Sequence, residues 1–302
     1  MPTDEKKKAT VELLFASVIW GFGFVATVWA LEEFSPVGFM SMRFGLAWIV
    51  GESLRYLFFS TRGNFFSWEE FKLSAGAGLL MASFLLPQTI GLIFTTATNS
   101  GFLTILYVIL VPLLSWILFR TKHSLNVYLL ASIAFVGAFL LMGAQLTGFN
   151  LGDLWTLLCA LMAALHILYV GRVSHKIQDS FRFNNYQSLW CLIAVLPLIP
   201  FDPKFSYWAS EVKPWLGLLA TAFGSSLLGF MIQIRAQKVL SDTTASQLFL
   251  LESPFAMLFG YLLLAEHMTP LKLSGAFLIL LSSYITLRLE RDGDSTKLKN
   301  LK

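Results

Sequence analysis

The sequence predicts an all-α polytopic membrane protein with ten transmembrane helices, and two observations carry this prediction. Ten long apolar stretches, separated by short polar loops, run along the 302 residues. Each stretch is close to the roughly 20 helical residues that cross a hydrocarbon core about 30 Å thick. Charged residues make up only 13% of the chain, against about 25% in soluble domains. The expected spans are 11–31, 37–59, 71–94, 98–119, 125–144, 152–172, 185–201, 214–235, 243–264 and 271–289.

The first span follows a basic segment that superficially resembles the start of a signal peptide. Lys6, Lys7 and Lys8 precede an apolar stretch that is longer than a usual signal-peptide core, so we interpret it as a membrane helix. Residues 1–10 and 290–302 are then short tails. Little chain is left for an extramembrane domain.

The basic residues set the orientation, because short cytoplasmic loops carry the excess of Lys and Arg. With the N-terminus inside, 18 of the 22 basic residues fall on the cytoplasmic side. Both termini are therefore expected in the cytoplasm. The absence of an Asn-x-Ser/Thr sequon is compatible with a bacterial origin, so we expect the bacterial cytoplasmic (inner) membrane. The residues expected inside are Lys6, Lys7, Lys8, Arg55, Arg62, Lys72, Arg120, Lys122, Arg172, Lys176, Arg182, Arg235, Lys238, Arg288, Arg291, Lys297, Lys299 and Lys302.

The chain also resembles itself across its two halves. Residues 110–114 align with 252–256, which places Pro112 over Pro254, and Glu12 similarly corresponds to Asp153. The repeats are expected over 11–144 and 152–289. Because five spans is an odd number, the second repeat must insert upside down relative to the first. Inverted repeats of this kind place a substrate site near the bilayer midplane and permit alternating access.

Several short stretches resemble the ten-helix EamA-type members of the drug/metabolite transporter superfamily. The resemblance covers nearly the whole chain and is weakest in the span 185–201. It implies an inverted repeat around a central cavity and the movement of small metabolites, often amino acids, commonly outward. The stretches that carry it are 16–25 with Trp20 and Gly21, Ser35-Pro36, Arg43-Phe44, 87–92, 99–102, 111–113, Pro254 and Glu266.

Two oppositely charged residues are the most informative polar candidates inside the spans. Glu252 lies near the middle of a span, where a carboxylate costs about 2.5–3.5 kcal/mol on insertion scales. It is a candidate for proton coupling or for binding a substrate amine, and the alternatives are a structural partner of an arginine or a protonated glutamic acid bonded to a backbone carbonyl. Arg43 is a candidate for a substrate carboxylate. Because the resemblance places an arginine there irrespective of substrate, we favour a structural role for Arg43.

The third and fourth spans add an amide and a phenol. Pro87 precedes Gln88, and a proline inside a membrane helix frees a carbonyl and kinks the axis. The alternative is a kink that serves packing alone, but a proline beside an intramembrane amide is typical of a discontinuous binding helix, which favours a binding role for Gln88. Tyr107 is a candidate cavity wall. Glu52 and Arg55 lie three residues apart on one helical face, so a local ion pair is expected there.

Further candidates lie at helical spacing in other spans. His166 and Tyr169 share a stripe in span 152–172, and Trp20 lies on an aromatic face of the first span. A lone histidine more often packs than carries protons, and an aromatic stripe more often packs than binds. Gln247 is a candidate from span 243–264. It occupies a different helical face from Glu252, so both reach one cavity only if Pro254 distorts the helix.

The expected function is a secondary transporter of a small polar or amphipathic metabolite, driven by protons or by the substrate gradient. The resemblance implies export of a compound such as an amino acid. A channel or membrane-embedded sensor is the alternative. No metal-binding His-Glu-x-x-His pair, nucleophile elbow or Walker loop occurs, so an enzyme, a metal site and a cofactor are not expected. The basic residues sit in loops and tails, so a nucleic-acid partner is not expected either. The expected partners are the substrate and the lipid bilayer, and the oligomeric state stays open.

Overall fold

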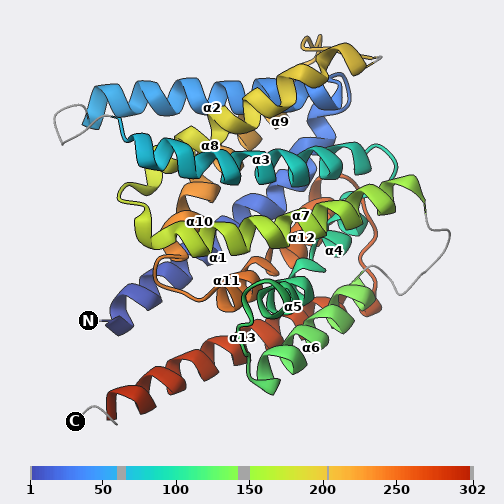
Figure 1. Ribbon diagram of the computed structural model, residues 1–302. Coiled ribbons are helices and arrows are strands. Elements are labelled where there is room, and N and C mark those ends of the chain that lie inside the picture. The colour runs from blue at the N-terminus through green and yellow to red at the C-terminus, as the bar shows by residue number, and fades with distance from the viewer. Residues whose placement is uncertain (1, 60–65, 142–149, 203, 300–302) are drawn as a thin grey trace.

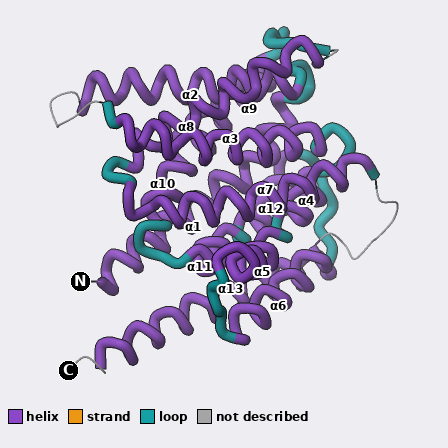
Figure 2. Tube along the Cα trace, viewed as in Figure 1, coloured by secondary structure: helices purple, strands orange, loops and turns teal. Residues whose placement is uncertain are grey.

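The computed structural model describes residues 2–59, 66–141, 150–202 and 204–299, and these residues form helices and loops without β-strands (Figure 2). Arg62 and Lys302, which were expected on the cytoplasmic side, lie outside the described residues. The first half contains α1 Pro2–Ala30, α2 Pro36–Phe59, α3 Trp68–Gly91, α4 Ala97–Thr104, α5 Tyr107–Phe119 and α6 Leu125–Leu141. The second half contains α7 Leu151–Val173, α8 Ser180–Val195, α9 Val212–Leu219, the π-helix η3 Ala220–Gly229, α10 Phe230–Ala236, α11 Asp242–Phe249, α12 Glu252–Leu263 and α13 Pro270–Lys299. Short 3₁₀ helices, η1 Ser174–Lys176 and η2 Leu196–Phe201, follow α7 and α8.

The all-helical, membrane-spanning architecture expected from the sequence is confirmed. Six helical segments of the described residues are long and apolar enough to cross a membrane, and α5 and α6 are shorter apolar helices. Every expected span coincides with helical structure. The number of ten crossings stays a prediction.

Two of the expected spans are interrupted near their middles. The segment 98–119 breaks between α4 and α5, and 243–264 breaks between α11 and α12. Pro254 lies in the first turn of α12, where its ring opposes the carbonyl of Leu250, and Leu250 lies in the break. Tyr107 and Glu252 are therefore the first residues of two half-helices. By contrast, α3 runs through Pro87 to Gly91 without interruption, so the helix carrying Gln88 is not discontinuous.

The helices stack in layers (Figure 1). Helices α2 and α9 lie at one edge, α6 and α13 pack together at the opposite edge, and α1 and α7 run through the interior. Helix α3 packs against α7 and α8, while α1 contacts α9, η3, α10 and α12 from the other half of the chain. The start of α1 and the end of α13 lie on the same side of the molecule. The interior helices thus bring residues from both halves to one centre.

Close approach of α1 and α12 depends on Gly21, and this predicts an asymmetric response to alanine. A Cβ on Gly21 would lie 2.8 Å from the carbonyl oxygen of Glu252, whereas a Cβ on Gly45 in α2 meets nothing closer than 4.0 Å. Gly21→Ala is expected to lower the free energy of unfolding by about 1–3 kcal/mol through overpacking. Gly45→Ala is the matched control and should be neutral or stabilising, because alanine favours helix by about 0.5–1 kcal/mol. Denaturant titration in micelles measures both, and equal effects of the two substitutions would refute the close-packing argument.

Candidate functional site

One cavity of about 80 Å³ lies where the two broken spans meet the interior helices. Its walls come from both halves of the chain, including α1, α3, α7, α10 and α12. Six of the eight site residues predicted from the sequence line it: Trp20, Arg43, Gln88, Tyr107, His166 and Glu252. The helix packing thus gathers residues that are spread over more than 230 positions of the chain.

The two half-helix starts meet in this cavity. Tyr107 is 3% exposed and Glu252 is 8% exposed. The Tyr107 hydroxyl donates a hydrogen bond of 3.1 Å to Oε1 of Glu252. This contact links α5 to α12 and satisfies one carboxylate oxygen with a neutral donor. The second oxygen has no hydrogen-bond partner among the described residues, which leaves it available to a ligand or a proton.

Gln88 contributes an amide from α3. Its Nε2 donates to Oγ1 of Thr104 at 3.1 Å, and Thr104 donates in turn to the carbonyl oxygen of Ser100 at 2.8 Å. Both Gln88 and Thr104 line the cavity. The last turn of α4 and the end of α3 are therefore joined at the cavity wall.

Arg43 reaches the cavity from α2 and is 4% exposed. Its Nε donates to Oγ of Ser226 at 2.7 Å, and its guanidinium carbon lies 5.3 Å from the centre of the Phe44 ring. Among the described residues, no ion pair joins Arg43 to a carboxylate. Arg43 and Glu252 thus share one cavity without neutralising each other directly.

A buried polar network behind the cavity was not identified from the sequence. His166 lies 3.4 Å, through Nε2, from Oε1 of Gln187, whose Nε2 donates to Oδ1 of Asn184 at 2.7 Å. Asn184 donates to the carbonyl oxygens of Ser226 and Leu227, at 3.0 and 2.9 Å. These carbonyls belong to the π-helix η3, a geometry that frequently occurs at functional sites. The network holds the segment that supports Arg43, and the polar run 184–188 in an otherwise apolar chain was the signal for it.

The expected Glu52–Arg55 ion pair is confirmed, with Nη1 of Arg55 2.6 Å from Oε1 of Glu52. The same Oε1 accepts a hydrogen bond of 2.6 Å from Nδ2 of Asn185. The pair therefore ties α2 to α8 rather than acting within α2 alone.

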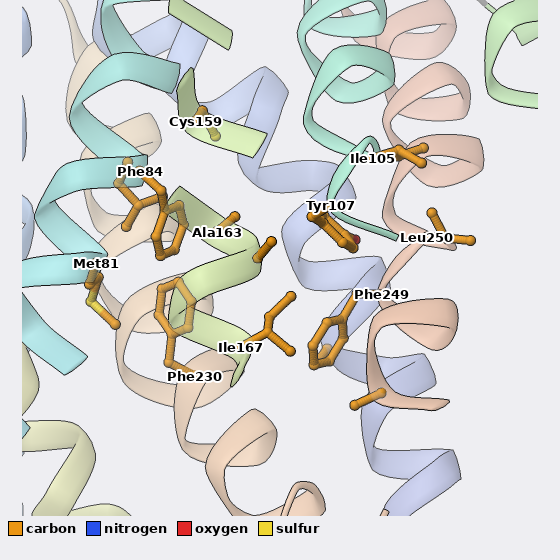
Figure 3. Packing of buried hydrophobic residues seen from close by; sticks show 14 of the residues in the cluster. Met81, Phe84, Ile105, Tyr107, Cys159, Ala163, Ile167, Phe230, Phe249 and Leu250 are labelled. Atoms are coloured by element: carbon orange, nitrogen blue, oxygen red, sulfur yellow. The ribbon is translucent and has the colours of Figure 1, made fainter. Parts of the chain in front are cut away.

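Aromatic rings form the apolar part of the cavity wall (Figure 3). The Phe84 and Phe230 rings make a T-shaped, edge-on contact with centres 6.1 Å apart, and Figure 3 shows Ile167 beside Phe249. Trp20 packs on Phe249 at 5.2 Å. The buried Trp20 Nε1 has no hydrogen-bond partner among the described residues. An indole N–H without a partner usually finds one when a polar ligand is present.

Tyr169 and Gln247 lie away from the cavity. The Tyr169 hydroxyl donates to the carbonyl oxygen of Leu73 at 2.8 Å and fits against Gly76, so it links α7 to α3. The carbonyl oxygen of Gln247 accepts a hydrogen bond of 2.9 Å from Ser283 in α13. Because the helix breaks at residues 250–251, Glu252 turns into the cavity while Gln247 packs between helices.

A second set of contacts closes the face opposite the chain termini. Glu33, in the loop after α1, accepts hydrogen bonds from Ser210 N at 2.7 Å, Ser210 Oγ at 2.8 Å and Glu211 N at 3.0 Å. These donors, the Ser210 backbone N–H first, lower the pKa of Glu33. Glu32 pairs with Lys213 in the same region. The loop after α1 is thereby fastened to the segment that leads into α9.

Within the part of the chain that the structure describes, no group of three or more His, Cys, Asp or Glu side chains is arranged to hold a metal ion. The two cysteines, Cys159 and Cys191, are both buried and unpaired. The cavity therefore offers one carboxylate, one guanidinium, amides, hydroxyls and aromatic faces to a ligand.

The chain is similar to a family of transporters, to two curated proteins and to a solved structure. A profile of the EamA-like transporter family matches residues 8–143 and again 150–288. The chain is 34% identical over 280 residues to an uncharacterized transporter of Archaeoglobus fulgidus, covering 92% of this chain and 85% of that protein. A second uncharacterized transporter of the same organism is 29% identical over 181 residues, 60% of this chain and 63% of that protein. A solved crystal structure shares the fold with a TM-score of 0.74 at 17% identity, covering 95% of this chain and 98% of that one.

Proposed function

Because the chain belongs to the EamA-like transporter family, we propose that it carries a small zwitterionic metabolite, such as an amino acid, across the membrane by alternating access. The family and the names of the relatives indicate an integral, multi-pass membrane transporter rather than an enzyme. We further propose that the protein lies in a bacterial inner membrane with both termini in the cytoplasm. Transport runs outward in this proposal, and protons are the coupling ion.

The observation that carries the substrate class is the pair of opposite charges in one cavity, and because of it we propose a substrate-binding role for Arg43 in place of the structural role favoured from the sequence. Glu252 and Arg43 both line it, both are buried and neither pairs directly with the other. A buried charge without a counter-charge is costly in a membrane. A ligand with an ammonium group for Glu252 and a carboxylate for Arg43 would satisfy both, the carboxylate through a bidentate contact. The aromatic wall around Trp20 would accept an apolar side chain.

The small volume of the cavity supports a transport cycle. Ligand pockets usually measure about 300–1,000 Å³, whereas this cavity measures about 80 Å³, so a metabolite enters only if the helices move. The twofold match of the family profile supports the proposal of two repeats, 11–144 and 152–289, with opposite orientations. The half-helix starts at Tyr107 and Glu252, one in each half, are the kind of discontinuity found at transporter binding sites.

Exchange of a radiolabelled amino acid in liposomes tests this proposal. We expect saturable counterflow for zwitterionic amino acids, and loss of it by more than about tenfold in Arg43→Ala, about 1.4 kcal/mol of binding. Amines that lack the carboxylate should bind the wild type and Arg43→Ala alike in a thermal-shift assay. Folded yield is the control, because a structural role for Arg43 predicts poor folding instead of a selective loss of carboxylate ligands.

Two outcomes would contradict the carrier mechanism. A current that rises with the substrate gradient without saturating would indicate a channel. The absence of any flux, together with specific ligand binding, would indicate a sensor.

A further inference from the structure

A second cavity, here called the vestibule, opens on the side of the molecule where the chain begins. It measures about 650 Å³, and its walls include Ser115, His123, Leu168, Arg172, Gln237 and Asp242. It lies among the ends of α5, α7 and α10 and the start of α11. The ion pair between Glu12 in α1 and Arg235 at the end of α10 places this region beside the start of α1. The vestibule is thus large enough for a metabolite and shares a side with the N-terminus.

Only a thin layer separates the vestibule from the central cavity. On α7, Ile167 lines the central cavity and the next residue, Leu168, lines the vestibule. On α10 and its cap, Gln233 lines the central cavity and Gln237 lines the vestibule. Four residues of helix span about 6 Å, so the barrier is about one helical turn thick.

A chain of amides closes this layer. Gln233 Nε2 donates to Oε1 of Gln237 at 3.0 Å. Gln237 Nε2 donates both to the carbonyl oxygen of Ile167 at 2.8 Å and to Oδ1 of Asp242 at 3.0 Å. Gln233 and Gln237 are 3% and 4% exposed. One side chain therefore connects α10, α7 and the start of α11 between the two cavities.

Gly171 in α7 leaves the space that the Asp242 side chain occupies. Any Cβ at Gly171 in α7 would collide with the carboxylate of Asp242. The absence of a side chain at Gly171 lets α11 approach α7 closely and brings Asp242 within reach of Gln237. Gln237 contacts α7 through a hydrogen bond between a neutral amide and a neutral carbonyl, which is weaker than its charge-assisted contact with Asp242. The contact with α7 can therefore break and re-form during a transport cycle.

From these contacts we propose that the vestibule is the access route from the N-terminal side to the central cavity, and that Gln237, held by Gln233, Ile167 and Asp242, is the latch that closes it. The inference rests on the proposed transport function and adds the position of the gate and the residues that form it. Opening requires α10 and α11 to move away from α7 as a unit.

Thiol accessibility tests the latch without any substrate. Ser225 lines the central cavity, and Ser225→Cys in a background with Cys159 and Cys191 replaced by alanine supplies a single reporter thiol. The probe is a membrane-impermeant methanethiosulfonate added on the N-terminal side of oriented proteoliposomes. Gln237→Leu should raise the labelling rate of the reporter by about tenfold, because the closed state loses the hydrogen bonds of the latch.

Gln247→Leu is the matched control, because it also removes a membrane-embedded glutamine amide, but one in α11 that accepts a hydrogen bond of 3.4 Å through Oε1 from Ser282 in α13. It should leave the labelling rate unchanged. Asp242→Ala, which removes the carboxylate acceptor and adds no bulk at Gly171, is the second variant and should also increase labelling. Unchanged labelling in both Gln237→Leu and Asp242→Ala, with wild-type thermal stability, would overturn the proposal, as would an equal increase in Gln247→Leu. Labelling reports the gate alone, so a failure of amino-acid exchange would refute the proposed substrate and leave this result intact.

Discussion

Replacing Glu252 with glutamine is expected to abolish accumulation driven by a pH gradient while exchange persists at saturating substrate. The substitution is nearly isosteric, and the glutamine oxygen still accepts the hydrogen bond that Tyr107 donates. A glutamine neither binds nor releases a proton, so the proton gradient no longer drives the cycle. A gradient of two pH units supplies about 2.7 kcal/mol per proton, which supports about hundredfold accumulation at one proton per substrate. That accumulation should fall to unity in Glu252→Gln.

The measurement compares uptake into proteoliposomes under an imposed pH gradient with counterflow at equal pH on both sides. Tyr107→Phe is the matched control, because it removes the hydroxyl that contacts Glu252 and keeps the carboxyl group. It should retain gradient-driven accumulation. Accumulation in Glu252→Gln that still follows the pH gradient would exclude Glu252 as the coupling group.

Replacing Glu70 with glutamine is expected to cause the largest loss of stability among these substitutions, about 3–5 kcal/mol. Glu70 is 1% exposed, and its Oε2 lies 2.5 Å from Nε of Arg182. Its Oε1 accepts hydrogen bonds from the backbone N–H groups of Gln178 and Asp179 at 2.6 and 3.1 Å. The substitution removes the carboxylate charge from a buried guanidinium and places an amide N–H₂ against donors. The start of α3 would then lose its attachment to the loop that leads into α8.

The free energy of unfolding in mixed micelles measures this effect, and an exposed ion pair provides the comparison. Glu32 and Lys213 are each more than 40% exposed as side chains. Glu32→Gln should change the stability by less than about 1 kcal/mol, as for other exposed pairs. Similar losses of unfolding free energy in Glu70→Gln and Glu32→Gln would show that burial does not increase the contribution of the Glu70–Arg182 pair to stability.

The breaks in the two interrupted spans could not be predicted from the sequence. A proline is tolerated in the first turn of a helix as well as at a kink, so Pro254 alone does not reveal that α12 begins at Glu252. Pro87 likewise lies inside an expected span, yet α3 continues through it. The outcome depends on whether neighbouring helices compensate for the freed carbonyl, which a single sequence does not encode locally.

For the candidate site, too, the sequence identifies candidate residues but not which of them face the cavity. Trp20, His166 and Tyr169 all lie at plausible depths for a cavity, but Tyr169 fits against Gly76 and contacts α3 instead. Rotation of a helix about its own axis decides which face meets the cavity, and that rotation is set by packing against other helices. The amides Asn184 and Gln187 were overlooked because a polar run at the start of an apolar segment also suits a helix end.

The order of apolar and polar residues is enough to identify this chain as a helical membrane protein, because hydrocarbon admits long apolar helices whose backbone hydrogen bonds are internal. It also singled out the rare polar residues within those helices, since their burial has a cost that chance seldom tolerates. Which of these polar residues converge depends on how the helices pack. Glu252 and Tyr107 meet because two separate helices break at their centres, and Gln237 closes a passage because Gly171 admits Asp242 beside it. Such contacts join residues far apart in the chain, so they follow from the packing of whole helices and not from any local pattern.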